Sequence, residues 1–523
     1  MSGHECIVVG SGINSLVCAA LLAKKGRHVR VLERNARLGG CIVTDTKSFP
    51  GFTLDLCSQW YPLFVTSPAY AALAPELHAR GVEFLNTDAP AAVLTPDGGS
   101  FVLRTSREAN VQNMEARAPG DGEAYARAMG ELERSAALTF ALLGSEPWSG
   151  AALRACLAYA WRNGPHGLAA YFGSALQRCR ARLNADFKSD IVRACIAPWV
   201  LHAGLGPDDL LSAQMARLIC FTLEQAGCPV VKGGSVRIVE AFVDIIRANG
   251  GECLTGVDVE RVLTHEGRAR GVRAADGTEF SADAVICNVT PTQLYGRLLE
   301  GGPVPDAVRG EARDYLYGRA AMQIHLVLDR PPGWADAALS RAGIIHLSAG
   351  ADAVSRAVNE AERGLLPAEG TIALGQPAAL DASRVPAGKG LLWLQLLELP
   401  RIIRGDAAGK IPTPADGRWN DAVRDAYAAR VIARVCRHLP ELESSISGRI
   451  VLGPHDLERM NVNLVGGDPY SGASSLEQYM LWRPLRSTRN HATPVRNLYH
   501  IGASTHPGPG LGGVSGFQVA RQL

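Results

Sequence analysis

Gly10 and Gly12 stand in a short turn whose residue types and spacing suit the binding of a diphosphate. The turn follows a β-branched apolar run at 7–9 and precedes an alanine-rich apolar stretch. Gly10 permits a tight turn, and Gly12 lets backbone amides approach a pyrophosphate at the positive end of a helix. A second apolar run ends at Glu33, whose carboxylate is placed to accept hydrogen bonds from a ribose. Strand, glycine turn, helix, strand and acid, in this order, predict a dinucleotide-binding unit.

Residues beside this turn add contacts to the same ligand. Ser15 stands where the third glycine of the G-x-G-x-x-G pattern is usual, and its small side chain keeps the helix near the strand. Immediately after Glu33, two cations and a glycine pair allow a second approach to the phosphates. The predicted contacts in that segment are Arg34, Arg37, Gly39 and Gly40. No second turn of this kind follows a strand elsewhere, so we expect one nucleotide site.

The composition is that of a globular protein with a large core. Of the 523 residues, 47% are hydrophobic and 20% are charged. Lys and Arg total 53 against 51 Asp and Glu, a net charge of +2, so no nucleic acid partner is expected. The 12 cysteines include no C-x-x-C pair, and their spacing suits neither a zinc site nor a disulfide framework. No metal site is therefore predicted.

The sequence favours a cytoplasmic protein. A strand expected to begin near Cys6 leaves no room for a signal peptide. The long uncharged stretches at 56–75 and 497–520 are broken by prolines or glycines, which a membrane-spanning helix tolerates poorly. Peripheral contact with a membrane stays open.

The rest of the chain divides into segments with clear periodicity. An amphipathic helix is expected at 236–249, because its apolar residues recur at helical spacing. Short strands follow it, and turn residues separate them. The region 108–223 is predicted to be mostly helical. The expected strands are 82–106 with a hairpin, 257–263, 271–274, 279–287, 320–328 and 391–399, and a further helix is expected at 419–439.

The N-terminal block resembles a known family. Residues 10–40 look like the opening of the FAD-dependent amine oxidase and phytoene desaturase superfamily. Asn14, followed two residues later by Leu16, is more like the carotenoid desaturase and ketolase-like branch. Cys41 stands after the glycine pair where amine oxidases usually have arginine, which argues against a close amine oxidase. The resemblance implies FAD as the cofactor, with Asn14 among its contacts.

The C-terminal segment carries the longest similarity. Residues 502–514 resemble the G-A-[GS]-T-H-P-G-x-G signature of carotenoid desaturases and ketolases. In that family the loop passes along the flavin, and the next helix directs its N-terminus at flavin N1 and the C2 carbonyl, where it stabilises negative charge. The resemblance therefore implies contacts from Gly502, Gly513 and Val514. It also implies that the backbone of Val259 meets the adenine.

The same resemblance implies an α/β fold in which a Rossmann-like FAD-binding domain is discontinuous. A mixed-sheet substrate domain with a helical cap fills the intervals. The predicted boundaries are 1–75, 228–300 and 490–523 for the FAD-binding domain, 76–227 for the substrate domain with its cap, and 301–489 for the rest of the substrate domain.

Bound FAD would take a hydride from a substrate C–H bond at flavin N5, while the protein positions the substrate and excludes water. Two catalytic candidates come from the family pattern. His506 lies in the flavin loop, where forming the turn is its alternative role. Arg483 belongs to an Arg-Pro pair before that loop, and a structural salt bridge is its alternative. Further residues placed near the cavity, each with core packing as the alternative, are Trp60, Tyr61 and His202.

We therefore expect an FAD-dependent oxidoreductase that dehydrogenates a largely apolar or aromatic small molecule and resembles carotenoid desaturases. The electron acceptor would be O2 or a quinone. A flavin-dependent isomerase or saturase and an amine or alcohol oxidase remain alternatives, because a fold does not fix the substrate. A non-catalytic FAD-binding protein would be indicated by a damaged flavin loop, whereas 502–514 is intact.

Overall fold

The first and last strands of the chain lie in one sheet of the computed structural model, which describes residues 5–523. All neighbouring strands of this sheet are parallel. Buried parallel strands read as continuous apolar runs, and β1 and β13 both fit that pattern. The order is β21 (Leu498–Ile501), β13 (Ala284–Asn288), β1 (Glu5–Val9), β2 (His28–Glu33) and β9 (Glu252–Thr255).

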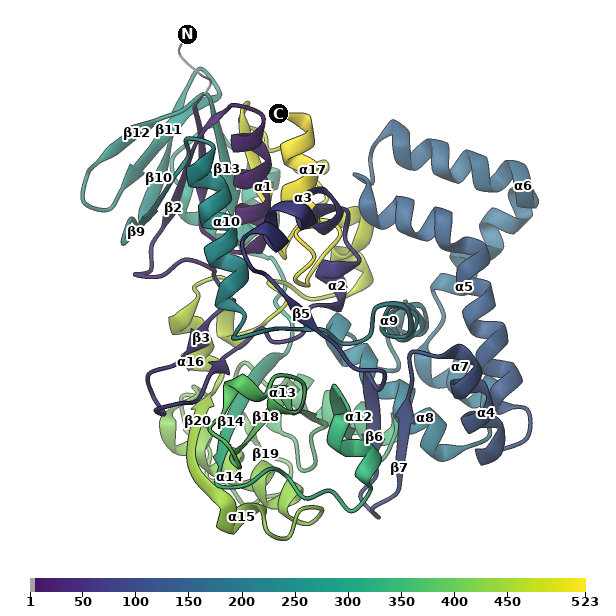
Figure 1. The fold of residues 1–523 in the computed structure, drawn as a ribbon. Helices are drawn as coiled ribbons and strands as arrows, with labels where there is room; N and C mark the ends of the chain where they lie inside the picture. The colour runs from purple at the N-terminus through teal and green to yellow at the C-terminus, as the bar shows by residue number, and fades with distance from the viewer. Residues whose placement is uncertain (1–4) are drawn as a thin grey trace.

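Alternate side chains of β1 enter two different cores. Cys6 and Val8 join a cluster with α1 (Ile13–Lys24), α10 (Val236–Ala248) and α17 (Val514–Gln522). Ile7 and Val9 point to the other face of the sheet, where they pack with residues of the π-helix η2 (Thr292–Leu298). The helices α1, α10 and α17 lie side by side over the sheet (Figure 1).

A three-stranded meander follows α10, with strands β10 (Val259–His265), β11 (Arg268–Ala274) and β12 (Glu279–Ser281). The prediction of one strand over 279–287 is wrong. The half-exposed β12 ends at Ser281, and the fully apolar β13 begins at Ala284 in the parallel sheet. Asp283 between them accepts a hydrogen bond from the backbone amide of Glu5, which holds the start of β13 beside β1 in the parallel sheet. The strand β9 was not expected.

A seven-stranded mixed sheet forms the second layer. Only β15 and β6 are parallel; the other neighbours run antiparallel. One face packs against α14 (Asp421–Cys436), and the other faces the helical cap. The predicted α/β class with a mixed sheet is confirmed. The order is β20 (Ile446–Leu452), β14 (Ala320–Leu328), β18 (Gly390–Leu399), β17 (Ile372–Gly375), β15 (Ile344–Leu347), β6 (Ala91–Leu94) and β7 (Ser100–Leu103).

The region 108–223 is helical, as predicted. Gly164, with φ of +75°, and the following Pro165 break α6 into two arms. Figure 1 shows α6 at the outer edge of the molecule, away from both sheets. Among the helices of residues 5–523, none is long and apolar enough to cross a membrane. The cap consists of α4 (Arg107–Arg117), α5 (Asp121–Gly144), α6 (Gly150–Ala175), α7 (Cys179–Asp186), α8 (Asp190–Ile196), η1 (Ala197–Ala203) and α9 (Ser212–Ala226).

Candidate active site

The two glycine turns predicted to approach a diphosphate touch each other. Gly10, with φ of +86°, turns the chain between β1 and α1, and Gly12 begins the helix. Gly40 has a φ of +61°, and a Cβ built there would lie 3.0 Å from the Cα of Gly12. A side chain would therefore separate the two turns. Together with Asn14 and Gly39, these glycines line one end of a large cavity.

Glu33 is fixed at the end of β2 and also lines the cavity. Its Oε2 accepts hydrogen bonds from the amide of Ser11 at 3.0 Å and from its hydroxyl at 2.6 Å. Its Oε1 accepts from the amide of Asn35 at 2.9 Å. The hydroxyl of Ser11 accepts from the amide of Gly39 at 2.9 Å, which ties both glycine turns to one carboxylate.

Replacing Glu33 by glutamine is expected to weaken FAD binding about 10–100-fold, because an amide N–H would meet a backbone donor and a charge-assisted hydrogen bond would be lost. Titration of FAD into deflavinated protein measures this. Glu252→Gln is the matched control, since Glu252 is an exposed residue on the neighbouring strand. An unchanged affinity in Glu33→Gln would remove Glu33 from the binding site.

Val259 begins β10 and lines the cavity. Its carbonyl accepts a hydrogen bond from Arg297 at 2.6 Å, and Arg297 also pairs with Asp258 at 2.6 Å. Arg34 lines the same end and is half exposed, 4.0 Å from Asp258. Arg37 is exposed and lies outside the lining. Ser15 is buried behind the turn, where its hydroxyl accepts from Asn288 at 2.9 Å.

The C-terminal loop reaches the cavity at four positions: Ala503, Ser504, Gly510 and Leu511. The predicted contacts Gly502, Gly513 and Val514 lie outside the lining, and the first two anchor the ends of this loop. The amide of Gly502 donates to Ser515 at 3.0 Å. Gly513, with φ of +68°, caps α17, and a Cβ there would lie 2.7 Å from Val17 of α1. The loop is thus attached to α1 at its end.

Arg483 is buried behind the C-terminal loop 502–514, the predicted flavin loop. It makes no ion pair within the described residues. Its Nε donates to the carbonyl of Ala503 at 3.0 Å, and its Nη2 donates to that of Tyr470 at 2.8 Å. Both of these residues line the cavity, whereas Arg483 does not. Its contacts favour a positioning role over both the predicted catalytic role and the alternative of a salt bridge.

His506 is buried outside the lining as well. Its Nε2 hydrogen-bonds the carbonyl of Leu142 at 2.9 Å, and its own carbonyl accepts from His491 at 3.1 Å. Burial lowers the pKa of His506 to about 4, which keeps the ring neutral at pH 7. These contacts join the loop to α5, and we do not carry His506 forward as a catalytic residue.

The seven-stranded sheet supplies the opposite wall of the cavity. Trp393, Gln395 and Leu397 project from alternate positions of β18, as the two-residue period of a strand requires. The cap adds Trp199 and His202 from η1, and the further lining residues Ile219, Thr222 and Leu223 come from α9. Trp60 lines the cavity, whereas Tyr61 is packed in the core.

Cys41 lines the cavity beside the glycine pair. Burial raises the pKa of its thiol, and Asn461 donates to its sulfur at 3.3 Å. Burial raises the pKa of Cys57, another lining residue, well above its usual value. Neither thiol is therefore poised to act as a thiolate nucleophile.

Sequence reasoning missed several lining residues. Asn288 ends a parallel strand next to β1, where ligand-binding side chains gather, so its position was a usable signal. Gln395 is the first polar residue in the largely apolar run of β18, which was a second signal. Ser58 and Gln59 follow the glycine pair in an irregular segment and had no distinguishing pattern.

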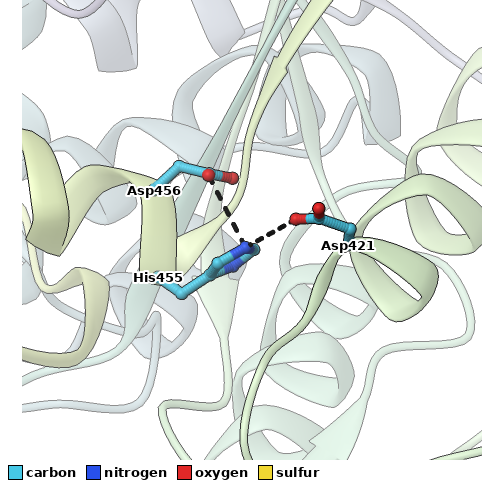
Figure 2. A group of neighbouring side chains, drawn as sticks. All are labelled: Asp421, His455 and Asp456. Atoms are coloured by element: carbon cyan, nitrogen blue, oxygen red, sulfur yellow. Dashed lines mark hydrogen bonds and ion pairs between the residues drawn. The ribbon is translucent and has the colours of Figure 1, made fainter.

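Among the described residues, one group of potential metal ligands lies outside the lining of this cavity: Asp421, His455 and Asp456, which have ligand atoms within 4.8 Å of one another (Figure 2). His455 Nε2 lies 3.1 Å from Asp421 and 3.5 Å from Asp456. The guanidinium groups of Arg424 and Arg459 already pair with Asp456. The group is therefore explained as an ion-pair network between α14 and α16 (Pro454–Met460).

The cavity has the features that FAD requires. One end offers two glycine turns, a helix N-terminus and the acid at the end of β2. The flavin loop reaches the lining further along. Gln59 also lines the cavity, and both atoms of its buried side-chain amide lack a hydrogen-bond partner among the described residues. A bound polar ring would supply such partners.

Comparison with known proteins places this site in context. The family model described as flavin containing amine oxidoreductase matches residues 16–522. The mouse (Mus musculus) pyridine nucleotide-disulfide oxidoreductase domain-containing protein 2 is 26% identical, over 99% of this chain and 93% of that protein. The zeta-carotene-forming phytoene desaturase of Myxococcus xanthus is 27% identical, over 97% and 91%. An oxidoreductase from Methanosarcina mazei shares the fold, with a TM-score of 0.62 at 16% identity over 99% of both chains.

Proposed function

Because the chain belongs to the flavin containing amine oxidoreductase family and is an FAD-dependent oxidoreductase, we propose that it dehydrogenates a largely apolar small molecule. The observation that carries this proposal is the distribution of charge around the cavity. The charged lining residues are Glu33, Arg34, Asp258 and Arg297, and all four belong to the nucleotide end. The wall built by the substrate domain and the cap is neutral and mostly apolar or aromatic.

In this proposal each part of the chain has one task. The glycine turns and Glu33 hold the nucleotide part of FAD. Bound FAD supplies the acceptor for a hydride from a substrate carbon. Arg483 keeps the carbonyls of Ala503 and Tyr470 in place along the loop. The aromatic wall excludes water and orients the substrate.

The name of the relative from M. xanthus supports an apolar substrate, since phytoene desaturase acts on phytoene. The neutral wall argues against a cationic amine, because an ammonium group buried without a carboxylate is costly. Hydride transfer from the substrate to FAD needs no side-chain nucleophile. The raised pKa values of the Cys41 and Cys57 thiols agree with this, because neither thiol is poised to act as a thiolate.

The test is anaerobic mixing of the FAD-loaded protein with phytoene, putrescine and a long-chain alcohol in separate experiments. Bleaching of the flavin absorption by phytoene or by the long-chain alcohol, which are both largely apolar, supports the proposal. Bleaching only by putrescine contradicts it, and product formed without bleaching indicates an isomerase. Reoxidation of the bleached protein with O2 or a quinone then identifies the electron acceptor.

We also propose that α6 contacts the surface of an anionic membrane. Leu153, Leu157 and Trp161 follow one another at a spacing of four residues and are exposed by 61%, 59% and 91%. They therefore form one apolar stripe on the outer face of the cap. The segment 147–185 has no Asp or Glu, and its exposed Arg154 and Arg162 have no acidic partner among the described residues. A tryptophan and arginines on one helix suit an interface with anionic lipid.

Replacing Arg154 and Arg162 together by glutamate is expected to lower binding to vesicles at least about tenfold, because each arginine near an anionic surface contributes about 1 kcal/mol. Co-sedimentation with vesicles of phosphatidylcholine and phosphatidylserine measures this. Arg363→Glu, on the exposed end of α12 (Ala351–Glu362), is the control. Equal binding by all variants, or a stable dimer that covers α6 in solution, would contradict the proposal.

A further inference from the structure

One row of the seven-stranded sheet is polar where it faces the cavity. Gln323 on β14 pairs directly with Gln395 on β18, and Gln395 pairs with Ala373 on β17. Ala373 in turn pairs with His346 on β15. Direct partners face the same side of a sheet, so two amides and an imidazole share this face. With strands about 4.8 Å apart, the small Ala373 leaves a gap of about 10 Å between Gln395 and His346.

Most hydrogen-bonding capacity of this row is unused by the protein. The Oε1 of Gln323 accepts from the indole of Trp393 at 2.7 Å, which leaves its amide nitrogen without a partner in the described chain. Gln395 lines the cavity and makes no side-chain hydrogen bond within residues 5–523. His346 contacts a single polar group, His202, with 2.9 Å between their Nε2 atoms.

This histidine pair presents a donor to the cavity. A contact between two Nε2 atoms requires that one donates and the other accepts. If His202 donated, His346 would carry its proton on Nδ1, which is buried without any partner. Burying an N–H donor without an acceptor costs more free energy than burying an acceptor nitrogen without a donor. The geometry therefore assigns the Nε2 proton to His346. His202 then carries its proton on Nδ1, at the cavity wall.

Two indoles add further donors. Trp199 packs against both histidine rings, at 4.8 Å and 4.6 Å between centroids. It is 3% exposed, and its Nε1 has no acceptor among the described residues. Trp60 is also on the lining, and its Nε1 is likewise buried and unpaired. These donors belong to the wall opposite the glycine turns. They are separate from the residues that hold the nucleotide.

A ligand group that accepts hydrogen bonds would satisfy these donors. The neighbouring histidines restrict the charge that this group can carry. Burial lowers the pKa of His202 to about 4, and burial together with His202 lowers that of His346 well below its usual value. The pair is therefore neutral at pH 7 and does not balance a carboxylate. A cation would find the amide oxygen of Gln395 on this wall but no carboxylate to balance its charge.

We infer that the substrate is an apolar molecule with one uncharged oxygen, a carbonyl or hydroxyl, which accepts hydrogen bonds from Trp199 and His202. This inference rests on the proposed function, because it names the class of molecule that the same cavity dehydrogenates. A pure hydrocarbon would leave the donors of this wall unpaired.

The experiment compares five C20 polyenes that differ only in their terminal group: retinal, retinol, axerophthene, retinylamine and retinoate. Binding to the FAD-loaded protein is measured by ultrafiltration and retinoid absorption. Retinal and retinol are expected to bind at least about tenfold more tightly than the hydrocarbon axerophthene and the two charged analogues. Equal affinities of axerophthene and retinal, or tighter binding of either charged analogue, would overturn the inference.

Variants then locate the oxygen. Trp199→Phe keeps an aromatic ring and removes the N–H, so we expect about tenfold weaker retinal binding with axerophthene unchanged within about twofold. Gln395→Leu changes a side chain without protein partners and is expected to weaken retinol selectively, which covers the case that Trp199→Phe fails to fold. Ile219→Val trims an apolar contact and should weaken all five ligands equally. The inference would be overturned if Ile219→Val, and neither of the other two variants, lost the preference for retinal and retinol over axerophthene.

The flavin absorption of the same samples separates the two proposals. Protein that shows the oxygen preference but is bleached by no substrate under anaerobic conditions retains the inference and loses the proposed dehydrogenation. Protein that is bleached by phytoene and shows no oxygen preference retains the proposed function and loses the inference.

Discussion

Replacing Arg384 by methionine is expected to lower the free energy of unfolding by about 3–5 kcal/mol, because it leaves a buried carboxylate without its cation. Arg384 and Asp55 are both 0% exposed, and Nη1 lies 2.7 Å from Oδ2. The guanidinium also pairs with Asp381 at 3.2 Å and donates to the carbonyl of Val231 at 2.6 Å. Urea denaturation measures the loss.

The consequence extends to the cavity wall. The hydroxyl of Ser235 lies 2.7 Å from Asp55 Oδ2 and 2.9 Å from the carbonyl oxygen of Ser58, a lining residue, and its single proton can donate to either acceptor. Arg384→Met should therefore also weaken FAD binding. Lys389→Met, which removes an exposed ion pair with Asp329, is the control and should cost less than about 1 kcal/mol. A double-mutant cycle with Asp55→Asn that shows no coupling between the two positions would contradict this account.

Replacing Gly516 by alanine should destabilise the protein by about 3 kcal/mol or more and abolish FAD retention. A Cβ at Gly516 would overlap the backbone carbonyl of Asn14, which belongs to the first turn of α1. Backbone atoms on both sides leave no flexible group to yield, so α1 and α17 must separate. That separation shifts the glycine turn that carries the predicted diphosphate contacts.

Flavin content after gel filtration and thermal unfolding measure both effects of Gly516→Ala. Gly310→Ala is the matched control, because Gly310 also lies inside a helix, α11 (Asp306–Arg313), and a Cβ there meets nothing within 4 Å. We expect that control to keep its flavin and to gain up to about 1 kcal/mol. A Gly516→Ala protein with normal flavin content would show that the two helices are not tightly coupled.

Local patterns made the nucleotide half of the site predictable. The β-branched run before Gly10, the alanine-rich helix and the acid at Glu33 are all contained in the first 33 residues, so their geometry follows from one supersecondary unit. The strand β14 was predicted at its observed bounds because seven of its nine residues are apolar, which signals a buried strand. The family and its FAD cofactor, expected from the same motifs, are confirmed by the match to the family model.

The substrate wall was not predictable, because pairing over long distances in the sequence builds it. Gln395 and His346 meet only through the register of β18, β17 and β15. Arg384 and Asp55 are 329 positions apart, and neither has a local signal. The alternative roles of His506 and Arg483 likewise depended on which carbonyl groups the folded chain brings to them.

The arrangement in which β21 completes the sheet begun by β1 has a consequence for biosynthesis. A ribosome synthesises the segment from 498 onward after all the other strands of this sheet, so the nascent polypeptide lacks the edge strand and α17 until that segment emerges. Cofactor loading thus follows synthesis of this segment. A premature stop codon just before residue 498 would yield protein without its prosthetic group.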